Sequence, residues 1–104
     1  MWNEETIEAV WNKAKRDSDE NEKNGFRKDQ CDAWIKKSAH GNRDSAYGWE
    51  IDHITPESRG GTDALSNLRP LHWGNNSSRQ DGRLTVYVTS EGNHNIYKDT
   101  GKRL

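Results

Sequence analysis

Residues 48–54 alternate strictly between two sets of side chains, which is the period of an extended strand. One set is Trp49, Ile51 and His53, and the other is Glu50, Asp52 and Ile54. A second apolar run, Leu68 to His72, predicts another strand, kept short because Pro70 lacks the amide hydrogen that a sheet needs. Residues 55–67 between them contain Pro56 and a Gly-Gly pair, and this composition predicts a loop.

Helical periodicity occurs near the N-terminus, where four apolar residues recur at the spacing of one helix face. They are Ile7, Val10, Trp11 and Ala14. Asn3 or Thr6 is the expected N-cap, because a short polar side chain can accept a hydrogen bond from a free backbone amide of the first turn. The pattern predicts an N-terminal helix that buries one face.

The segment that follows is harder to assign. Residues 17–24 contain no apolar side chain and end at a glycine, so we expect a loop or a frayed helix end. Residues 26–39 fit neither period well. A short helix over 27–37 and a strand over 33–37 are both compatible with the pattern.

A further helix is predicted after the second strand of the 48–72 segment. Asn75 or Asn76 would cap it, and it would run to about Gln80 and close at Gly82.

The C-terminal part shows a second strand-like alternation over residues 84–89. A turn at 91–93 would bring residues 95–98 back to pair with it, so a C-terminal hairpin is expected. The tail, residues 99–104, is expected to be loose.

Length and composition limit the size of the core. The chain has 104 residues, of which 29% are hydrophobic and 32% charged, so a single domain spanning residues 1–104 is expected. Large side chains must then supply most of the buried area, and we expect all five tryptophans to be core or half-buried anchors. They are Trp2, Trp11, Trp34, Trp49 and Trp73.

The single cysteine, Cys31, excludes an internal disulfide and a cysteine-rich zinc ribbon. No stretch resembles a signal peptide or a membrane span, so we expect a soluble, intracellular (cytoplasmic) protein with no membrane partner. The net charge of -1 is not that of a strongly basic nucleic-acid-binding domain.

Three residues suggest chemistry if the two strands and the helix after them fold together. The Asp52 carboxylate and the Asn76 amide offer hard oxygen donors, which suit Mg²⁺ or Mn²⁺. The imidazole of His53 can take a proton from water near neutral pH. A metal ion at a phosphate and a base for water are the minimum needed to hydrolyse a phosphodiester.

The ordered set of features over residues 48–79 resembles an HNH endonuclease motif of the ββα-metal (His-Me finger) type. The features are Asp-His on a strand, a Gly-rich loop, the Asn-Leu-Arg-Pro-Leu-His run, and Asn-x-x-Arg opening a helix. The resemblance implies an α+β domain whose ββα-metal core spans about 48–82. It also implies one divalent metal ion, Mg²⁺ or Mn²⁺, and double-stranded DNA as the substrate.

The resemblance also implies roles for individual residues. His53 matches the general base, and Asp52 matches the metal-binding acid. Asn67 matches the middle Asn of the motif, which braces the loop so that the histidine is aimed. Asn76 matches the last metal-binding position, and Arg79 stands where a phosphate contact is expected.

Two departures from the family pattern change the expectation. Many members hold a structural zinc ion with two Cys-x-x-Cys pairs, but the second pair would fall on His72 and Asn75, so no structural zinc is expected. The near-neutral charge implies locally focused DNA binding or a protein partner. Glu50 shares a strand face with Asp52 and is either an additional group near the metal or a surface carboxylate.

The sequence therefore predicts a metal-dependent endonuclease that hydrolyses DNA. The alternative is a non-catalytic, metal-stabilised DNA- or protein-binding module of a phage or restriction assembly. No helix-turn-helix or zinc-finger pattern supplies base recognition, so the sequence predicts no target site.

Overall fold

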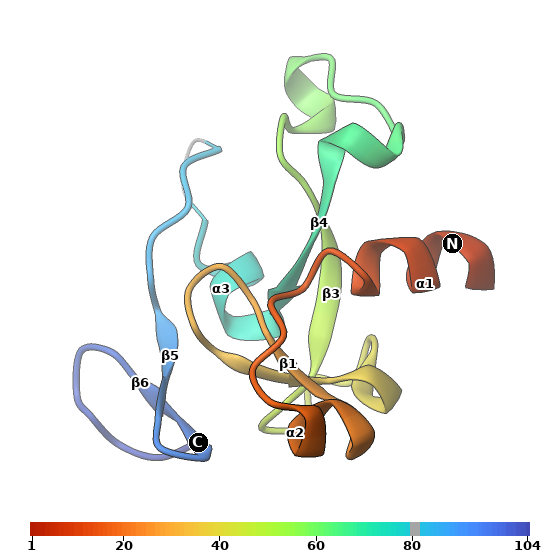
Figure 1. Ribbon diagram of the computed structural model, residues 1–104. Coiled ribbons are helices and arrows are strands. Elements are labelled where there is room, and N and C mark those ends of the chain that lie inside the picture. The colour runs from red at the N-terminus through yellow and green to blue at the C-terminus, as the bar shows by residue number, and fades with distance from the viewer. Residues whose placement is uncertain (80–81) are drawn as a thin grey trace.

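The computed structural model describes residues 1–79 and 82–104, and it shows a mixed α+β domain. The strands of this part of the chain form three separate two-stranded antiparallel sheets: β1–β2, β3–β4 and β5–β6. The β3–β4 ribbon runs through the middle of the molecule and carries the loop of residues 55–67 at one end (Figure 1). None of the described helices is long and apolar enough to cross a membrane.

The central ribbon forms as predicted. Strand β3 (Trp49–His53) pairs with β4 (Leu68–His72) in an antiparallel register that sets Asp52 opposite Arg69 and His53 opposite Leu68. The loop between them contains two short 3₁₀ turns, at Glu57–Arg59 and Leu65–Asn67. The loop therefore brings its two ends together at the C-terminal end of β3, beside His53.

Helix α3 (Trp73–Ser77) starts directly after β4, earlier than predicted. The predicted asparagine caps are wrong, because the ring nitrogen Nδ1 of His72 accepts the amide of Gly74 at 3.0 Å and caps the helix instead. Asn75 and Asn76 consequently lie inside the helix. The helix ends at Ser77, before the predicted end at Gln80, which lies outside the described residues.

The N-terminal helix α1 (Glu4–Trp11) is confirmed, with the Asn3 side chain accepting the Thr6 amide at 2.8 Å. Its apolar face packs on the central ribbon, where the rings of Trp11 and Trp49 lie 5.3 Å apart. The buried core cluster draws on α1, β2, β3 and β4, and consists of Val10, Trp11, Ala14, Ile35, Trp49, Ile51 and Leu68. All five tryptophans are buried or half-buried, as expected.

Residues 17–39 contain more regular structure than their pattern predicted. Ser18 caps a separate short helix, α2 (Asp19–Lys23), so the expectation of a loop or frayed end is wrong. Of the two alternatives for 26–39, the strand is correct: β2 (Trp34–Lys36) pairs with β1 (Phe26–Lys28). The pattern missed β1 because a three-residue strand is too short to show a period.

The C-terminal hairpin exists but is shifted along the chain. Strand β5 (Val88–Glu91) begins later than predicted and pairs with β6 (His94–Tyr97). The tail is not loose, because the Tyr97 amide donates to the Lys102 carbonyl at 2.9 Å and the Leu104 amide donates to the Asn95 carbonyl at 3.1 Å.

The carboxylate of Asp29, only 1% exposed, joins distant parts of the fold. One oxygen accepts the amides of Cys31 and Ala33 in the β1–β2 connection, at 2.9 and 3.0 Å. The other accepts the His72 amide at 2.9 Å and the Asn75 side-chain amide at 3.1 Å, at the junction of β4 and α3. Positions 72 and 75, where the resemblance would place zinc-binding cysteines, are thus held by hydrogen bonds.

We predict that Asp29→Asn strongly destabilises the fold. An amide nitrogen in place of one carboxylate oxygen must face two N–H donors, so two buried hydrogen bonds are lost at a cost of roughly 3–5 kcal/mol. Urea unfolding followed by tryptophan fluorescence measures this loss. The matched control is Asp32→Asn, which alters an exposed ion pair with Lys15 and should cost below about 1 kcal/mol. Equal losses in the two variants would contradict the role of Asp29.

Candidate active site

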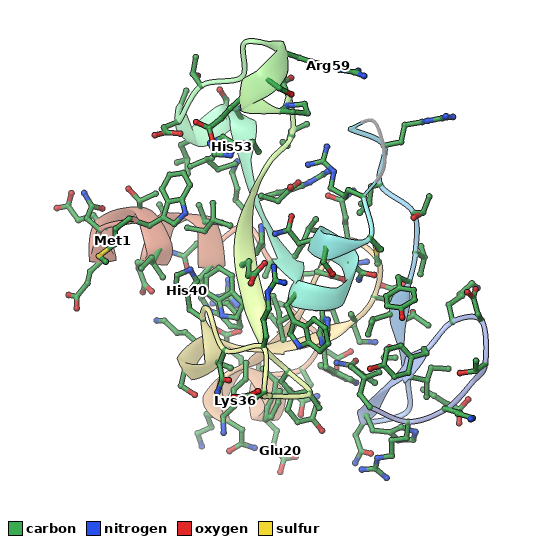
Figure 2. The ribbon with its side chains drawn as sticks, turned by 180° about the vertical axis from the view of Figure 1, so that it is seen from behind. Met1, Glu20, Lys36, His40, His53 and Arg59 are labelled. Atoms are coloured by element: carbon green, nitrogen blue, oxygen red, sulfur yellow. The ribbon has the colours of Figure 1, made fainter. Side chains whose placement is uncertain are left out.

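His53 occupies the last position of β3, where the central ribbon meets the 55–67 loop (Figure 2). Its ring nitrogen Nε2 lies 2.7 Å from the carboxylate of Asp63, and Nδ1 lies 3.9 Å from the carboxylate of Glu57. The ring of Trp2 lies 5.5 Å from the imidazole. These side chains surround a hollow of about 350 Å³, lined by Met1, Trp2, Ile51, His53, Glu57 and Asp63. The imidazole is therefore accessible from solvent, and its side chain is 17% exposed.

Asn67 holds the two ends of the loop beside His53 together. Its side-chain oxygen accepts the Thr55 amide at 2.8 Å, and its amide nitrogen donates to the carbonyls of Thr55 and Thr62 at 3.1 and 2.8 Å. Its backbone carbonyl accepts the Ile54 amide at 2.8 Å. Through its side chain and its backbone carbonyl, Asn67 thus contacts the two residues after His53 and the residue just before Asp63.

Asp52 lies on the opposite face of β3 from His53 and is buried, with 6% of its side chain exposed. One carboxylate oxygen accepts from Nε of Arg69 at 2.7 Å, and the other accepts from Nη1 of Arg79. Two guanidinium groups therefore neutralise the acid that the sequence indicated as a metal ligand.

Arg79 is directed into the protein, whereas the sequence predicted a contact with a substrate phosphate. Besides Asp52, its guanidinium donates to the carbonyls of His53, Ile54 and Gly82 at 2.7, 3.2 and 2.5 Å. Only 9% of the side chain is exposed. In this arrangement Arg79 ties the segment after α3 to the end of β3.

Asn76 points toward Glu50 and does not hydrogen-bond to Asp52 in the described part of the chain. Its amide nitrogen donates to one Glu50 oxygen at 2.8 Å, and Arg43 donates to the other at 2.7 Å. The hydrogen bond from Arg43, assisted by that from Asn76, lowers the pKa of Glu50 below its ordinary value, so this carboxylate is ionised at neutral pH. Glu50 is therefore a charged neighbour of Asn76.

A sequence model of the HNH endonuclease family matches residues 31–82, half of the chain. The chain belongs to the HNH endonuclease family. No curated protein and no solved structure matches it. The matched segment includes β2, β3, β4 and α3, and all five site residues indicated by the sequence lie within it. Membership indicates nuclease-type activity on DNA, and HNH endonucleases generally bind a divalent metal ion.

The residues available for such an ion form two groups, one on each face of β3. Asp52 and Asn76 offer the carboxylate and amide oxygens that suit a hard divalent cation. Both Asp52 oxygens accept hydrogen bonds from arginine, so an ion that binds there competes with two guanidinium groups for the same carboxylate. The second group, His53, Glu57 and Asp63, places one ligand atom from each residue within 4.8 Å of the others.

No pattern in the sequence indicated Glu57, Asp63 or Trp2 as neighbours of His53. Glu57 and Asp63 are ordinary polar loop residues by pattern, and Trp2 is far from His53 in the sequence, just before α1. The only available signal was the position of Asp63 in the loop that Asn67 was expected to brace. The contact itself depends on how that loop folds back on β3.

We predict that Arg79→Met destabilises the domain by roughly 2–4 kcal/mol, because it leaves the buried Asp52 oxygen and three backbone carbonyls without their donor. Thermal unfolding followed by circular dichroism measures the loss. Arg59→Met is the matched control: Arg59 extends from the tip of the loop (Figure 2) and is exposed. The control should change stability by no more than about 0.5 kcal/mol. A neutral Arg79→Met would contradict the structural role assigned to this guanidinium.

Proposed function

We propose that this HNH protein is a metal-dependent endonuclease that hydrolyses phosphodiester bonds of double-stranded DNA. The observation that carries the proposal is the placement of His53. Its imidazole lies at the end of a strand, in an open hollow, beside a loop closed by Asn67. A base of this kind must be fixed in orientation and open to water and substrate at the same time, and His53 combines both properties.

In the proposed reaction, His53 removes a proton from the water that attacks the scissile phosphorus. Asn67 does not touch the substrate and serves to keep the loop closed. Ile51 and Trp2 form the apolar side of the hollow, which limits the directions from which water reaches the imidazole.

Asp52 and Asn76 are the proposed ligands of one Mg²⁺ or Mn²⁺ ion. A bound ion of this type polarises the phosphoryl oxygen and stabilises the charge that develops on the leaving 3′-oxygen. The closeness of Asn76 to the ionised Glu50 supports this assignment, because a second carboxylate increases the local attraction for a cation. Arg69 and Arg79 compete with the ion for Asp52 when no substrate is bound.

The near-neutral net charge bears on how DNA is held. A chain with formal charge -1 lacks the broad positive field of a strongly basic DNA-binding domain. We propose that binding relies on local contacts around the ribbon end or on a protein partner that supplies the remaining affinity.

We predict that His53→Ala abolishes plasmid cleavage in Mg²⁺ or Mn²⁺, with a loss of roughly 10²–10⁴-fold, the usual contribution of a general base. Cleavage is measured as conversion of supercoiled plasmid to nicked and linear forms. His94→Ala, on the C-terminal hairpin, is the control and should cleave like the wild type. Equal activity of the wild type and His53→Ala would overturn the catalytic assignment.

Metal binding gives an independent test of the proposed ligands. We expect Asp52→Asn to weaken Mn²⁺ binding by about 10-fold or more, because the ion loses a charged oxygen ligand. Arg69→Gln should tighten binding, because it removes a cation that competes for the same carboxylate. Isothermal titration of the free protein with Mn²⁺ measures both. If Glu57→Gln weakens binding and Asp52→Asn does not, the ion instead binds beside His53.

The alternative function is a DNA- or protein-binding module without catalysis. The double arginine contact of Asp52 favours it, since a carboxylate neutralised in this way is a weaker metal ligand. Binding of Mn²⁺ and of duplex DNA by the wild type without any nicking would support this alternative.

A further inference from the structure

The carboxylate of Asp63 makes the closest polar contact of the His53 ring, at 2.7 Å from Nε2. Asp63 is a loop residue whose side chain is 71% exposed, and it approaches the imidazole from outside the β3–β4 ribbon. The other ring nitrogen, Nδ1, has the Glu57 carboxylate 3.9 Å away, beyond hydrogen-bonding distance. The two nitrogens of the ring therefore have different environments.

The loop holds Asp63 in this place through its neighbours on both sides. The Thr62 carbonyl, directly before Asp63, accepts from the Asn67 side chain at 2.8 Å. The Ala64 carbonyl, directly after it, accepts the Asn67 amide at 2.8 Å. Asn67 thus fixes the backbone on each side of Asp63, and its side chain also bonds to Thr55, two residues after His53. Asp63 is positioned by the same residue that closes the loop.

A carboxylate at this position has a defined effect on a neutral imidazole. An ionised carboxylate can only accept hydrogen bonds, so the nitrogen facing it must carry the hydrogen. Asp63 therefore favours the tautomer with hydrogen on Nε2 and leaves the lone pair on Nδ1, which has no hydrogen-bond partner among residues 1–79 and 82–104.

We propose that Asp63 is a positioning residue for His53, holding the Nε2–H tautomer so that Nδ1 accepts the proton of the attacking water. The role in turnover rests on the proposed nuclease function, whereas the effect on the tautomer does not. Asn67 then acts on His53 through Asp63: its hydrogen bonds to the loop set the place of the carboxylate, and the carboxylate sets the ring.

Glu57 provides a matched control. It is an acid of the same loop, its side chain is exposed to a similar extent at 74%, and it lines the same hollow. Asp63→Ala and Glu57→Ala each remove one negative charge from beside the imidazole. A difference between these two variants reports the contact with Nε2, because the change in net charge is the same.

The test uses the whole 104-residue chain, without metal for the first measurement. Long-range ¹H–¹⁵N spectra of the neutral His53 ring distinguish a protonated from an unprotonated ring nitrogen. We expect the wild type and Glu57→Ala to show hydrogen on Nε2, Asp63→Ala to show a mixture of tautomers, and Asp63→Glu to restore the Nε2–H form. An unchanged tautomer in Asp63→Ala would overturn the proposal, whatever the protein does to DNA.

The second measurement is steady-state cleavage of a duplex oligonucleotide in Mn²⁺. Asp63→Ala should lower kcat by about tenfold or more and leave KM within about twofold, because a misoriented base affects the chemical step and not DNA binding. Glu57→Ala should lower kcat less than Asp63→Ala does, and Asp63→Glu should recover part of the loss. Equal losses of kcat in Asp63→Ala and Glu57→Ala would overturn the positioning role. If the wild type does not cleave, the nuclease function fails, and the spectra alone still decide whether Asp63 orients His53.

Discussion

The buried carboxylate of Asp29 is the interaction on which the arrangement of this small domain most depends. Each of the three described sheets has two strands, which by themselves are marginally stable in water. Asp29 joins the β1–β2 connection to the junction of β4 and α3, and Asn75, which donates to it, also bonds to the backbone of Val88 at the start of β5. Burial raises the pKa of the nearby Cys31 thiol to about 11, so the cysteine stays protonated and adds no thiolate to this network. Hydrogen bonds of buried polar side chains thus hold the small sheets together. In a longer chain, a large hydrophobic core would do this.

This framework has a direct consequence for the site. Because the β4–α3 junction is fixed, the two neighbouring asparagines of α3 have separate tasks: Asn75 is buried and structural, and Asn76 faces Glu50 on β3. The turn after β4 also fixes the start of the segment that carries Arg79 to the end of β3. The far end of the ribbon is held by different means, since Asn67 braces the loop with hydrogen bonds to backbone groups. The candidate site lies between these two supports.

Charge is distributed unequally across β3. On one face, two exposed carboxylates flank His53, and on the other, two arginines neutralise the buried Asp52. Clustered carboxylates repel a phosphate unless a cation binds, and a neutralised Asp52 attracts a cation weakly until an arginine leaves. Within the proposed function, metal and DNA binding are therefore coupled, because the phosphate offers Arg69 or Arg79 an alternative anionic partner. When substrate is absent, the two arginines then weaken the attraction of Asp52 for a cation.

The sequence by itself determined the parts of this protein whose cause is local. The alternation of residues 48–54 and the apolar spacing from Ile7 to Trp11 each encode an element with one buried face, and the order of Asp52, His53, Asn67 and Asn76 indicated the family. The tertiary structure decided whatever depends on partners distant in sequence. His72, and not an asparagine, caps α3; Arg79 turns inward to Asp52; β1 forms because β2 lies beside it; and the tail is ordered by pairing with β6. The contact of Asp63 with His53 belongs to this second group. It forms when the loop of residues 55–67 closes on itself. Hydrogen bonds across such a loop produce no periodicity or fixed spacing in the sequence, so no pattern predicts them.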